Sequence, residues 1–338
     1  MRAVVLTARF LFSANYLKVC YNKPYKTKTE DIMDYSQILS QQFNIKEEYA
    51  KNIITLLDDG NTIPFIARYR KEMHGSMDDQ LIREFAEKLE YLRGLDKRRD
   101  EIRSLIDTQE KLTDEINLAL DKAATLSELE DIYRPYRPKR KTRASIAKEK
   151  GLEPLANDIL KQEKGFDPSK SAVDYIDEEK GVTSVEDAIQ GAMDIIAELV
   201  SDNAEIRKRI RNLTNANGVL VSVATDEEKD SVYKNYYDYK EPVKKIAGHR
   251  VLAVNRGEKE GFLKVSVETD SEKPLNSIFR AMITDKNQLC SDIIREACTD
   301  AYQRLIYPSI EREVRNDLTD LREGVGTQSV LVAHHHQL

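Results

Sequence analysis

The 338-residue chain has no tryptophan and only three cysteines, nine prolines and thirteen glycines. Cys20, Cys290 and Cys298 form no CxxC pair and have no histidine nearby in the sequence. This excludes a disulfide framework and favours small apolar side chains in a reducing compartment. Few turn formers, with 40% hydrophobic and 33% charged residues, indicate a mainly helical protein with a sizeable core.

An excess of positive charge is also missing, because the net charge is −6 and the sequence pI is about 5.6. Domains that bind nucleic acid are usually basic, so any contact with a polyanion must come from a local patch. The apolar run near the N-terminus is split by Arg9, and what remains is too short to span a bilayer. We therefore expect a cytoplasmic protein without a membrane partner.

Enzyme motifs are absent as well. The sequence contains no GxxxxGK phosphate loop, no GxSxG elbow and no HExxH zinc motif. His74 and His249 are isolated, and the run His334–His336 lies in a tail without context. We predict no enzymatic activity, no cofactor and no metal site.

Periodicity predicts the organisation of the chain. Apolar residues recur at helical spacing from Met33 onward, and Asp78 is predicted to cap a long helix. The period changes at Gly218, after which residues 218–224 are predicted as one strand and residues 249–269 as two more around the turn Arg256-Gly257-Glu258. Helical spacing returns after Pro274, and Pro308 is predicted to open a new helix.

The predicted fold class is mainly α, a multi-helix N-terminal region with a small α/β insert of about three strands. The predicted divisions are a disordered leader (1–32), a helical domain (33–217), a small strand-containing unit (218–272), a helix pair (273–320) and a non-matching tail (321–338).

The least ordinary stretch is Tyr133–Arg143, YRPYRPKRKTR, in which six of eleven residues are Arg or Lys and none is acidic. On an extended backbone its cations could contact phosphates while Tyr133 and Tyr136 stack on bases. In the alternative interpretation the cations pair with acidic helices of the same chain and the tyrosines pack into the core. The candidate contact residues here are Arg134, Arg137, Lys139, Arg140, Lys141 and Arg143.

A second basic group, Arg70 and Lys71, lies at the end of a predicted helix that starts near Pro64 and could lie along a nucleic-acid backbone. Nearby Arg68 is predicted instead to be a buried ion-pair partner. The tyrosines at 233, 236, 237 and 239 are predicted to be structural rather than a stacking platform.

Four strings resemble the N-terminal region of the bacterial Tex family. They are IPFIARYRKE (63–72), LEDIYRPYRPKRKTRASIAKEKGLEPLA (129–156), YYDYKEPVKKIAGHRVLAVNRGEKEG (236–261) and DAYQRLIYPSIEREVR (300–315). The resemblance covers residues 33–320 in order. It implies a cytoplasmic transcription accessory factor with a helix-turn-helix-like part, followed by a YqgF (RNase H-like) domain, helix-hairpin-helix elements and a C-terminal OB-fold RNA-binding domain. We expect this chain to be truncated before the YqgF domain, through a frameshift or a split gene.

The predicted function is that of a truncated, non-enzymatic, Tex-like RNA-binding transcriptional accessory protein with auxiliary nucleic-acid contacts from the basic segment. Its expected partners are RNA or DNA, bound weakly, and the transcription or translation machinery. The alternative is a protein-interaction scaffold that docks on that machinery without touching nucleic acid. A nuclease is disfavoured, because the catalytic carboxylates of an RNase H-like domain would lie downstream.

Overall fold

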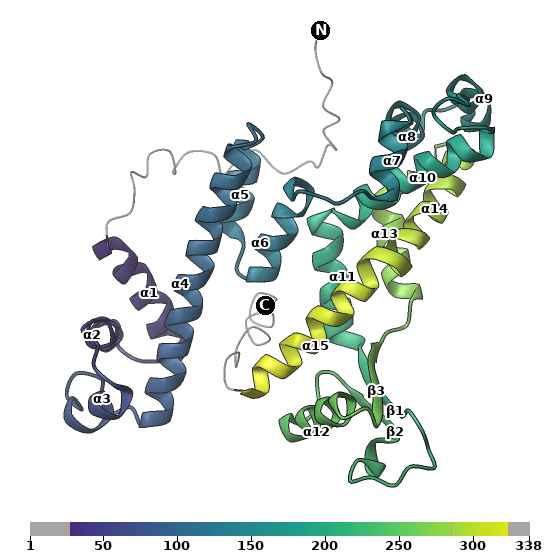
Figure 1. The fold of residues 1–338 in the computed structure, drawn as a ribbon. Coiled ribbons are helices and arrows are strands. Elements are labelled where there is room, and N and C mark those ends of the chain that lie inside the picture. Colours follow the sequence, from purple (N-terminus) through teal and green to yellow (C-terminus); the bar gives the residue numbers. More distant parts are fainter. Residues whose placement is uncertain (1–27, 285, 324–338) are drawn as a thin grey trace. The chain divides into compact units, whose positions relative to one another are not determined.

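The structure is a computed structural model that describes residues 28–284 and 286–323, and these residues are mainly helical (Figure 1). This confirms the predicted fold class. The chain divides into two compact units, residues 1–92 and 93–338, and the division falls inside the long helix α4 (Asp79–Asp107). Cys20 and the histidine run of the tail lie outside the described residues.

The first unit contains α1 (Lys28–Phe43), α2 (Glu47–Asp58), α3 (Ile63–Tyr69) and the first part of α4. Because α1 begins at Lys28, the predicted leader boundary at residue 32 falls inside a helix. The core of the unit is formed by buried apolar side chains from all four helices, including Leu39, Ile53, Ile66, Ile82 and Phe85. Asp78 accepts a hydrogen bond from the backbone N–H of Leu81, which confirms the predicted cap.

The second unit begins with the remainder of α4 and has one main core, which runs from Ala144 to Leu318. The predicted domain boundaries at residues 217 and 272 lie within this core. Its further α-helices are α5 (Asp114–Lys122), α6 (Leu126–Tyr133), α7 (Arg143–Glu149), α8 (Glu153–Lys161), α9 (Pro168–Ala172), α10 (Val185–Ser201), α11 (Ala204–Asn217), α12 (Gly248–Lys259), α13 (Glu272–Met282), α14 (Gln288–Asp300) and α15 (Tyr307–Glu323).

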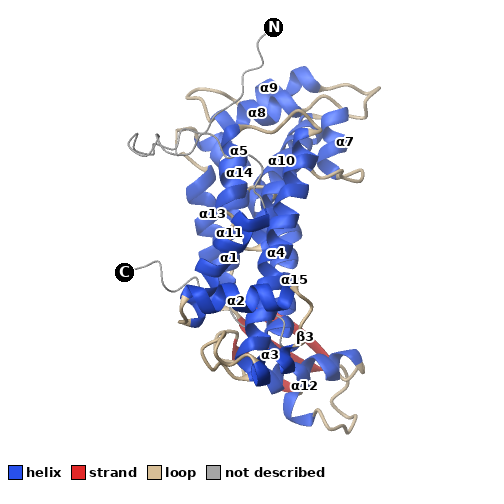
Figure 2. Ribbon diagram, turned by 90° about the vertical axis from the view of Figure 1, so that its left-hand side faces the viewer, coloured by secondary structure: helices blue, strands red, loops and turns tan. Residues whose placement is uncertain are grey.

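A three-stranded antiparallel sheet of order β2-β1-β3 lies beside α12 and α15 (Figure 2). Its strands are β1 (Val219–Ala224), β2 (Asp238–Pro242) and β3 (Leu263–Glu268). Side chains of α15 satisfy the outer edge of β3: Tyr307 donates to the Val267 carbonyl at 2.7 Å, and Glu311 accepts from the Val267 N–H at 3.0 Å. Covering an edge in this way prevents pairing with another chain.

One predicted strand is wrong. The segment HRVLAVN belongs to α12, and the third strand is β2, which comes from the tyrosine-rich stretch before it. Val251, Val254 and Gly257 are buried at helical spacing, and a Cβ on Gly257 would lie 2.6 Å from Leu263. Short β-branched runs are compatible with a strand or with a helix, and the close packing of Gly257 against Leu263 of β3 favours the helix here.

α15 begins at Tyr307, one residue before its predicted start at Pro308, but no break separates it from the preceding helix. α14 continues through a π-helical turn, η4 (Ala301–Ile306), directly into α15. Proline lacks a backbone N–H, and its ring would crowd the carbonyl four residues earlier in a regular α-helix. The wider turn before Pro308, in which the Tyr307 N–H donates to the Tyr302 carbonyl, accommodates the ring without ending the helix.

No helix among the described residues is long and apolar enough to cross a membrane. Within the same residues, no group of three or more His, Cys, Asp or Glu side chains could hold a metal ion. Cys290 and Cys298 are buried free thiols on α14, and burial raises the pKa of Cys298 to about 12. The two cysteines are therefore apolar core residues, as predicted.

Candidate nucleic-acid interface

The basic segment Tyr133–Arg143 connects α6 to α7. Pro135 and Pro138 stop α6 from continuing, and the chain makes a single 3-10 turn over Arg134–Tyr136 before it becomes extended. Thr142 then opens α7 with a capping box: its hydroxyl accepts from the Ser145 N–H at 3.0 Å, and Ser145 accepts from the Thr142 N–H at 2.8 Å. The segment is thus held at both ends by helices.

Three cations of this segment are already paired within the chain. Arg134 lies 3.2 Å from Asp202, and Lys139 contacts both Asp202 and Glu198. The Asp202 and Glu198 side chains are only 13% and 19% exposed. Arg137 pairs with Glu130 of α6. These contacts fasten the segment to α6 and to the C-terminal end of α10, as in the alternative interpretation above.

The two tyrosines of the segment face the protein rather than solvent. Tyr133 is buried, and the guanidinium groups of Arg98 and Arg137 lie 5.7 and 5.6 Å from its ring centroid. Tyr136 is half-buried, and burial raises its pKa. Tyr133 has no free face on which a base could stack.

The remaining candidates of the segment are more accessible. Lys141 lies 3.6 Å from Glu149, and both side chains are about two-thirds exposed, so this pair is weak. Arg140 and Arg143 are exposed and form no ion pair with the described residues. Burial raises the pKa of nearby Asp194, although the charges of Arg143 and Arg304 oppose that shift.

Arg70 and Lys71, at the end of α3, are exposed and make no ion pair with any side chain that the structure describes. Arg68 is also exposed, so the prediction of a buried ion pair for it is wrong. The α3 helix is amphipathic: Ile66 is buried, and Arg68 faces away from the core.

The turn that follows α3 is fixed by contacts with side chains of α2. Asn52 of α2 donates to the Met73 carbonyl at 3.1 Å. Gly75 has a φ of +65°, and a Cβ there would lie 2.6 Å from the Tyr49 ring. Only glycine adopts this conformation at such close approach without strain.

Two aromatic side chains that were not predicted as site residues lie beside these cations. Phe65 and Tyr69 are 37% and 67% exposed, and their ring centroids are 5.4 Å apart. The Arg70 guanidinium lies 5.8 Å from the Phe65 centroid. Their i, i+4 spacing, which places both rings on one side of α3, is the signal that could have found them. We call the group Phe65, Arg68, Tyr69, Arg70 and Lys71 the α3 platform.

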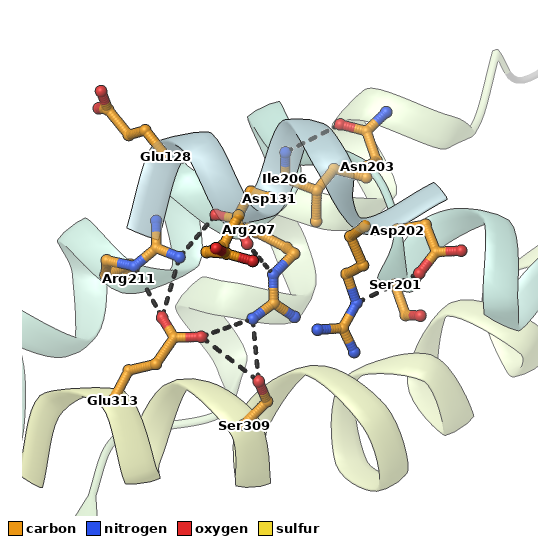
Figure 3. A network of polar contacts seen from close by, with 12 residues as sticks. Glu128, Asp131, Ser201, Asp202, Asn203, Ile206, Arg207, Arg211, Ser309 and Glu313 are labelled. Atoms are coloured by element: carbon orange, nitrogen blue, oxygen red, sulfur yellow. Dashed lines mark hydrogen bonds and ion pairs between the residues drawn. The ribbon is translucent and has the colours of Figure 1, made fainter. Parts of the chain in front are cut away.

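A buried ion network lies beside the basic segment (Figure 3). The fully buried Arg207 of α11 donates to Asp131 of α6 at 2.5 Å and to Glu313 of α15 at 2.8 Å. Arg211 donates to the same two carboxylates at 2.6 and 2.9 Å. Burial alone would lower the pKa of Arg211, but Asp131 and Glu313 outweigh it and raise that pKa. The network joins three helices and was not predicted.

The tyrosine cluster is structural, as predicted. Tyr233 is buried, and Tyr236, Tyr237 and Tyr239 pack against the main core. Tyr237 donates to the Ser231 hydroxyl at 3.0 Å, and Tyr239 contacts Glu241, which also pairs with Arg250 at 2.7 Å. These rings pack within or against the core, and two of their hydroxyl groups are hydrogen-bonded, so they form no stacking surface.

Comparison with known protein families gives two matches. The Tex-like protein N-terminal domain matches residues 33–107, and the Tex central region-like family matches residues 163–325. The first match includes the α3 platform, and the second includes Arg207, Arg211 and Glu313 of the buried network. The basic segment lies between the two matched regions.

Three curated relatives illustrate the similarity. The uncharacterized protein YdcI of Bacillus subtilis is 43% identical over 295 residues, which are 85% of this chain and 41% of that protein. The transcriptional accessory protein Tex of Neisseria gonorrhoeae is 34% identical over 311 residues, covering 89% of this chain and 40% of its own length. The human S1 RNA-binding domain-containing protein 1 is 30% identical over 312 residues, or 87% of this chain and 31% of that protein. The chain therefore spans less than half the length of these relatives, and it belongs to the Tex family, of which it carries the N-terminal and central regions.

Proposed function

We propose that this chain is a non-enzymatic helical module of a cytoplasmic transcription accessory factor and makes auxiliary, sequence-independent contacts with nucleic acid. The name of the Neisseria relative, transcriptional accessory protein, supports the setting. The name of the human relative, which refers to an S1 RNA-binding domain, supports a nucleic-acid partner for the longer protein. The contact residues in this chain are the cations that its own carboxylates leave exposed.

One observation carries this proposal. Arg70 and Lys71 are exposed and unpaired among the described residues, whereas Arg134, Arg137 and Lys139 are held by Glu130, Glu198 and Asp202. A phosphate that binds an unpaired cation displaces only counterions and water, but at a paired cation it must also compete with a carboxylate. Arg70 and Lys71 are therefore the primary contacts, and Arg140 and Arg143 are secondary ones.

A salt titration with the full chain tests the proposal. Binding of labelled single strands and duplexes is measured by fluorescence anisotropy, and log affinity is plotted against log salt. Each phosphate contact contributes a slope of about −0.9 on duplex and about −0.7 on single strands. We expect the double variant Arg70→Ala/Lys71→Ala to reduce the steepness by about 1.4 to 1.8.

The matched control is Lys122→Ala/Arg209→Ala, which removes two exposed cations elsewhere and changes the net charge equally. An unchanged slope in the Arg70/Lys71 variant would show that these residues are not the contacts. Undetectable binding of every strand at low salt would overturn the proposed function itself.

A second candidate function is a scaffold that docks on the transcription or translation machinery without binding nucleic acid. It is supported by the internal pairing of the basic segment and by the net charge of −6. Pull-down of purified RNA polymerase or ribosomes by the full chain, after nuclease treatment, tests this candidate. Retention of either assembly together with absent strand binding would favour it over the first.

A further inference from the structure

The exposed face of α3 presents two aromatic rings that the core does not use. Phe65 and Tyr69 lie one helical turn apart, with their ring planes inclined by 38°. Tyr69 is 67% exposed, far more than an aromatic side chain that serves packing alone. The pair forms a small apolar surface that is exposed to solvent. It does not belong to the core of the first unit, which consists of other apolar side chains.

Positive charge surrounds these rings. Between Ile63 and Met73 there are three cations, Arg68, Arg70 and Lys71, and one acid, Glu72. All three cations are exposed and form no ion pair with the described residues. On a chain with a net charge of −6, this is a local island of positive charge.

Exposed rings beside unpaired cations match the chemistry of single-stranded nucleic acid. Unpaired bases expose their π faces and stack on aromatic side chains, while arginine and lysine follow the backbone phosphates. A duplex keeps its base faces inside the helix and offers only phosphates and groove edges. An acidic peptide would satisfy the cations but would leave both ring faces without a planar partner.

We infer that the α3 platform binds single-stranded nucleic acid, stacking unpaired bases on Phe65 and Tyr69 while Arg68, Arg70 and Lys71 contact the phosphates. This rests on the proposed function and adds its preference for unpaired strands. The Arg70 guanidinium lies 5.8 Å from the Phe65 centroid, so one cation of the platform is next to an aromatic ring of the same platform. The turn anchored by Asn52 and Gly75 holds this arrangement in place.

The first test separates stacking from charge. The full chain carrying Phe65→Leu/Tyr69→Leu keeps its charge, and leucine is a good helix former, so α3 is expected to fold. Its affinity for a labelled thymidine dodecamer should fall by roughly tenfold or more, because stacking contributes strongly for each base. Its affinity for an abasic strand of equal length should stay the same, and the salt slope should be unchanged.

The matched control for this variant is Leu118→Ala/Leu289→Ala, which trims two side chains that are about half exposed and lie in the other unit. Both variants should show the circular dichroism spectrum of the unmodified chain. The control should bind the thymidine strand like the unmodified chain.

A second test uses the absence of tryptophan from the sequence. Tyr69→Trp introduces a single tryptophan that keeps a stacking ring at the site. We expect its fluorescence to be quenched by the thymidine strand and to change little with the abasic strand. Binding of this variant should remain within about threefold of the unmodified chain, because indole and phenol rings both stack.

The outcomes distinguish the two proposals. Strands that bind with a slope dependent on Arg70 and Lys71, but equally well after the leucine substitutions, would overturn the stacking inference and leave the proposed function standing. Duplex binding as tight as single-strand binding would also overturn it. So would polyglutamate that displaces the dodecamer and quenches the fluorescence of the Tyr69→Trp variant to the same extent. Absence of all strand binding would remove both.

Discussion

The two basic stretches of this chain differ in whether their cations are paired with carboxylates of the same chain. Tyr133–Arg143 is the denser stretch, yet Arg134, Arg137 and Lys139 are paired with carboxylates of α6 and of the C-terminal end of α10. Arg70 and Lys71 are few and unremarkable in the sequence, yet the described residues leave them unpaired. Charge density in a sequence thus measures how many cations are present and does not measure how many remain available to a ligand.

The source of the difference is the carboxylates of α6 and of the C-terminal end of α10. Glu130 of α6 pairs with Arg137, while Glu198 and Asp202 pair with Arg134 and Lys139. The carboxylates of α6 also hold cations outside the segment: Glu128 pairs with Lys208 at 2.9 Å, Glu130 with Arg98 at 2.7 Å and Asp131 with Arg207 at 2.5 Å. Arg137 shares Glu130 with Arg98. Within the described part of the first unit, no carboxylate pairs with the cations of α3 in this way. An adjacent acidic element therefore converts a basic segment from a ligand surface into a structural connector.

The largest expected loss of stability comes from removing Asp131, the buried carboxylate of α6. Asp131→Ala leaves Arg207 fully buried and Arg211 nearly so, with only Glu313 to balance them. Breaking a buried ion pair from one side typically costs about 3–5 kcal/mol. Urea unfolding monitored by circular dichroism should show this loss.

The control for Asp131→Ala is Lys51→Ala, which breaks an exposed pair with Glu47 and should cost at most about 0.5 kcal/mol. An Asp131→Ala variant as stable as this control would mean that the network contributes nothing to the position of α6.

The next effect concerns the turn that carries Arg70 and Lys71. Gly75→Ala places a Cβ at a positive φ and within 2.6 Å of the Tyr49 ring, so it should destabilise the first unit by about 1–3 kcal/mol. Gly60→Ala is a matched comparison, since its φ is +81° but no atom lies within 4 Å. Unfolding curves should show the smaller loss for Gly60→Ala, and equal losses would argue against close packing of the turn on Tyr49.

A third experiment removes the carboxylates that pair with the basic segment, so that its cations become unpaired like those of the α3 platform. Glu130→Gln, Glu198→Gln and Asp202→Asn together remove the partners of Arg134, Arg137 and Lys139. Affinity for nucleic acid should rise several-fold at low salt, and the single-strand slope should steepen by about 0.7 for each cation that becomes available.

The control for this variant removes three exposed acids elsewhere, Glu178→Gln, Glu179→Gln and Glu228→Gln, with the same change in net charge. Equal gains in both variants would attribute the effect to overall charge, and the contrast between the two stretches would then lose its structural basis.

Much of the fold could be predicted because local signals agreed with it. α10 can be recognised from its sequence, since Ser184 caps it and apolar residues recur along one face. The residues of α12 and β2 were assigned wrongly, because the valines of α12 suit a strand locally and the polar, tyrosine-rich β2 does not look like one. Pairing with β1 and packing against Leu263 decide these two cases, and neither is visible in a local window.

The candidate site was less predictable than the fold. Sequence could identify the cations at 134–143 and at 70–71, but whether each one is paired depends on contacts such as Lys139 with Asp202, 63 positions apart. The exposure of Phe65 and Tyr69 also depends on which face of a seven-residue helix meets the core. In a helix of two turns, periodicity defines that face poorly.

The smallest expected effect concerns Glu128, the carboxylate of α6 that the preceding experiments leave unchanged. Burial alone would raise the pKa of Glu128, but hydrogen bonds from Lys208 and the Ala124 N–H, with the charges of Lys208 and Arg211, bring that pKa below its usual range. Since the pKa is depressed in the folded state, the stabilisation is present above the unfolded pKa of about 4.3 and is lost as pH falls through the folded value. Glu128→Gln should therefore be less stable than the unmodified chain at pH 7, by about 0.5–1 kcal/mol, and nearly equal to it below pH ~3. Urea midpoints at the two pH values measure this difference. A gap that stays constant between them would mean that Glu128 acts through its shape and backbone cap, and that the charge of α6 matters only at Glu130 and Asp131.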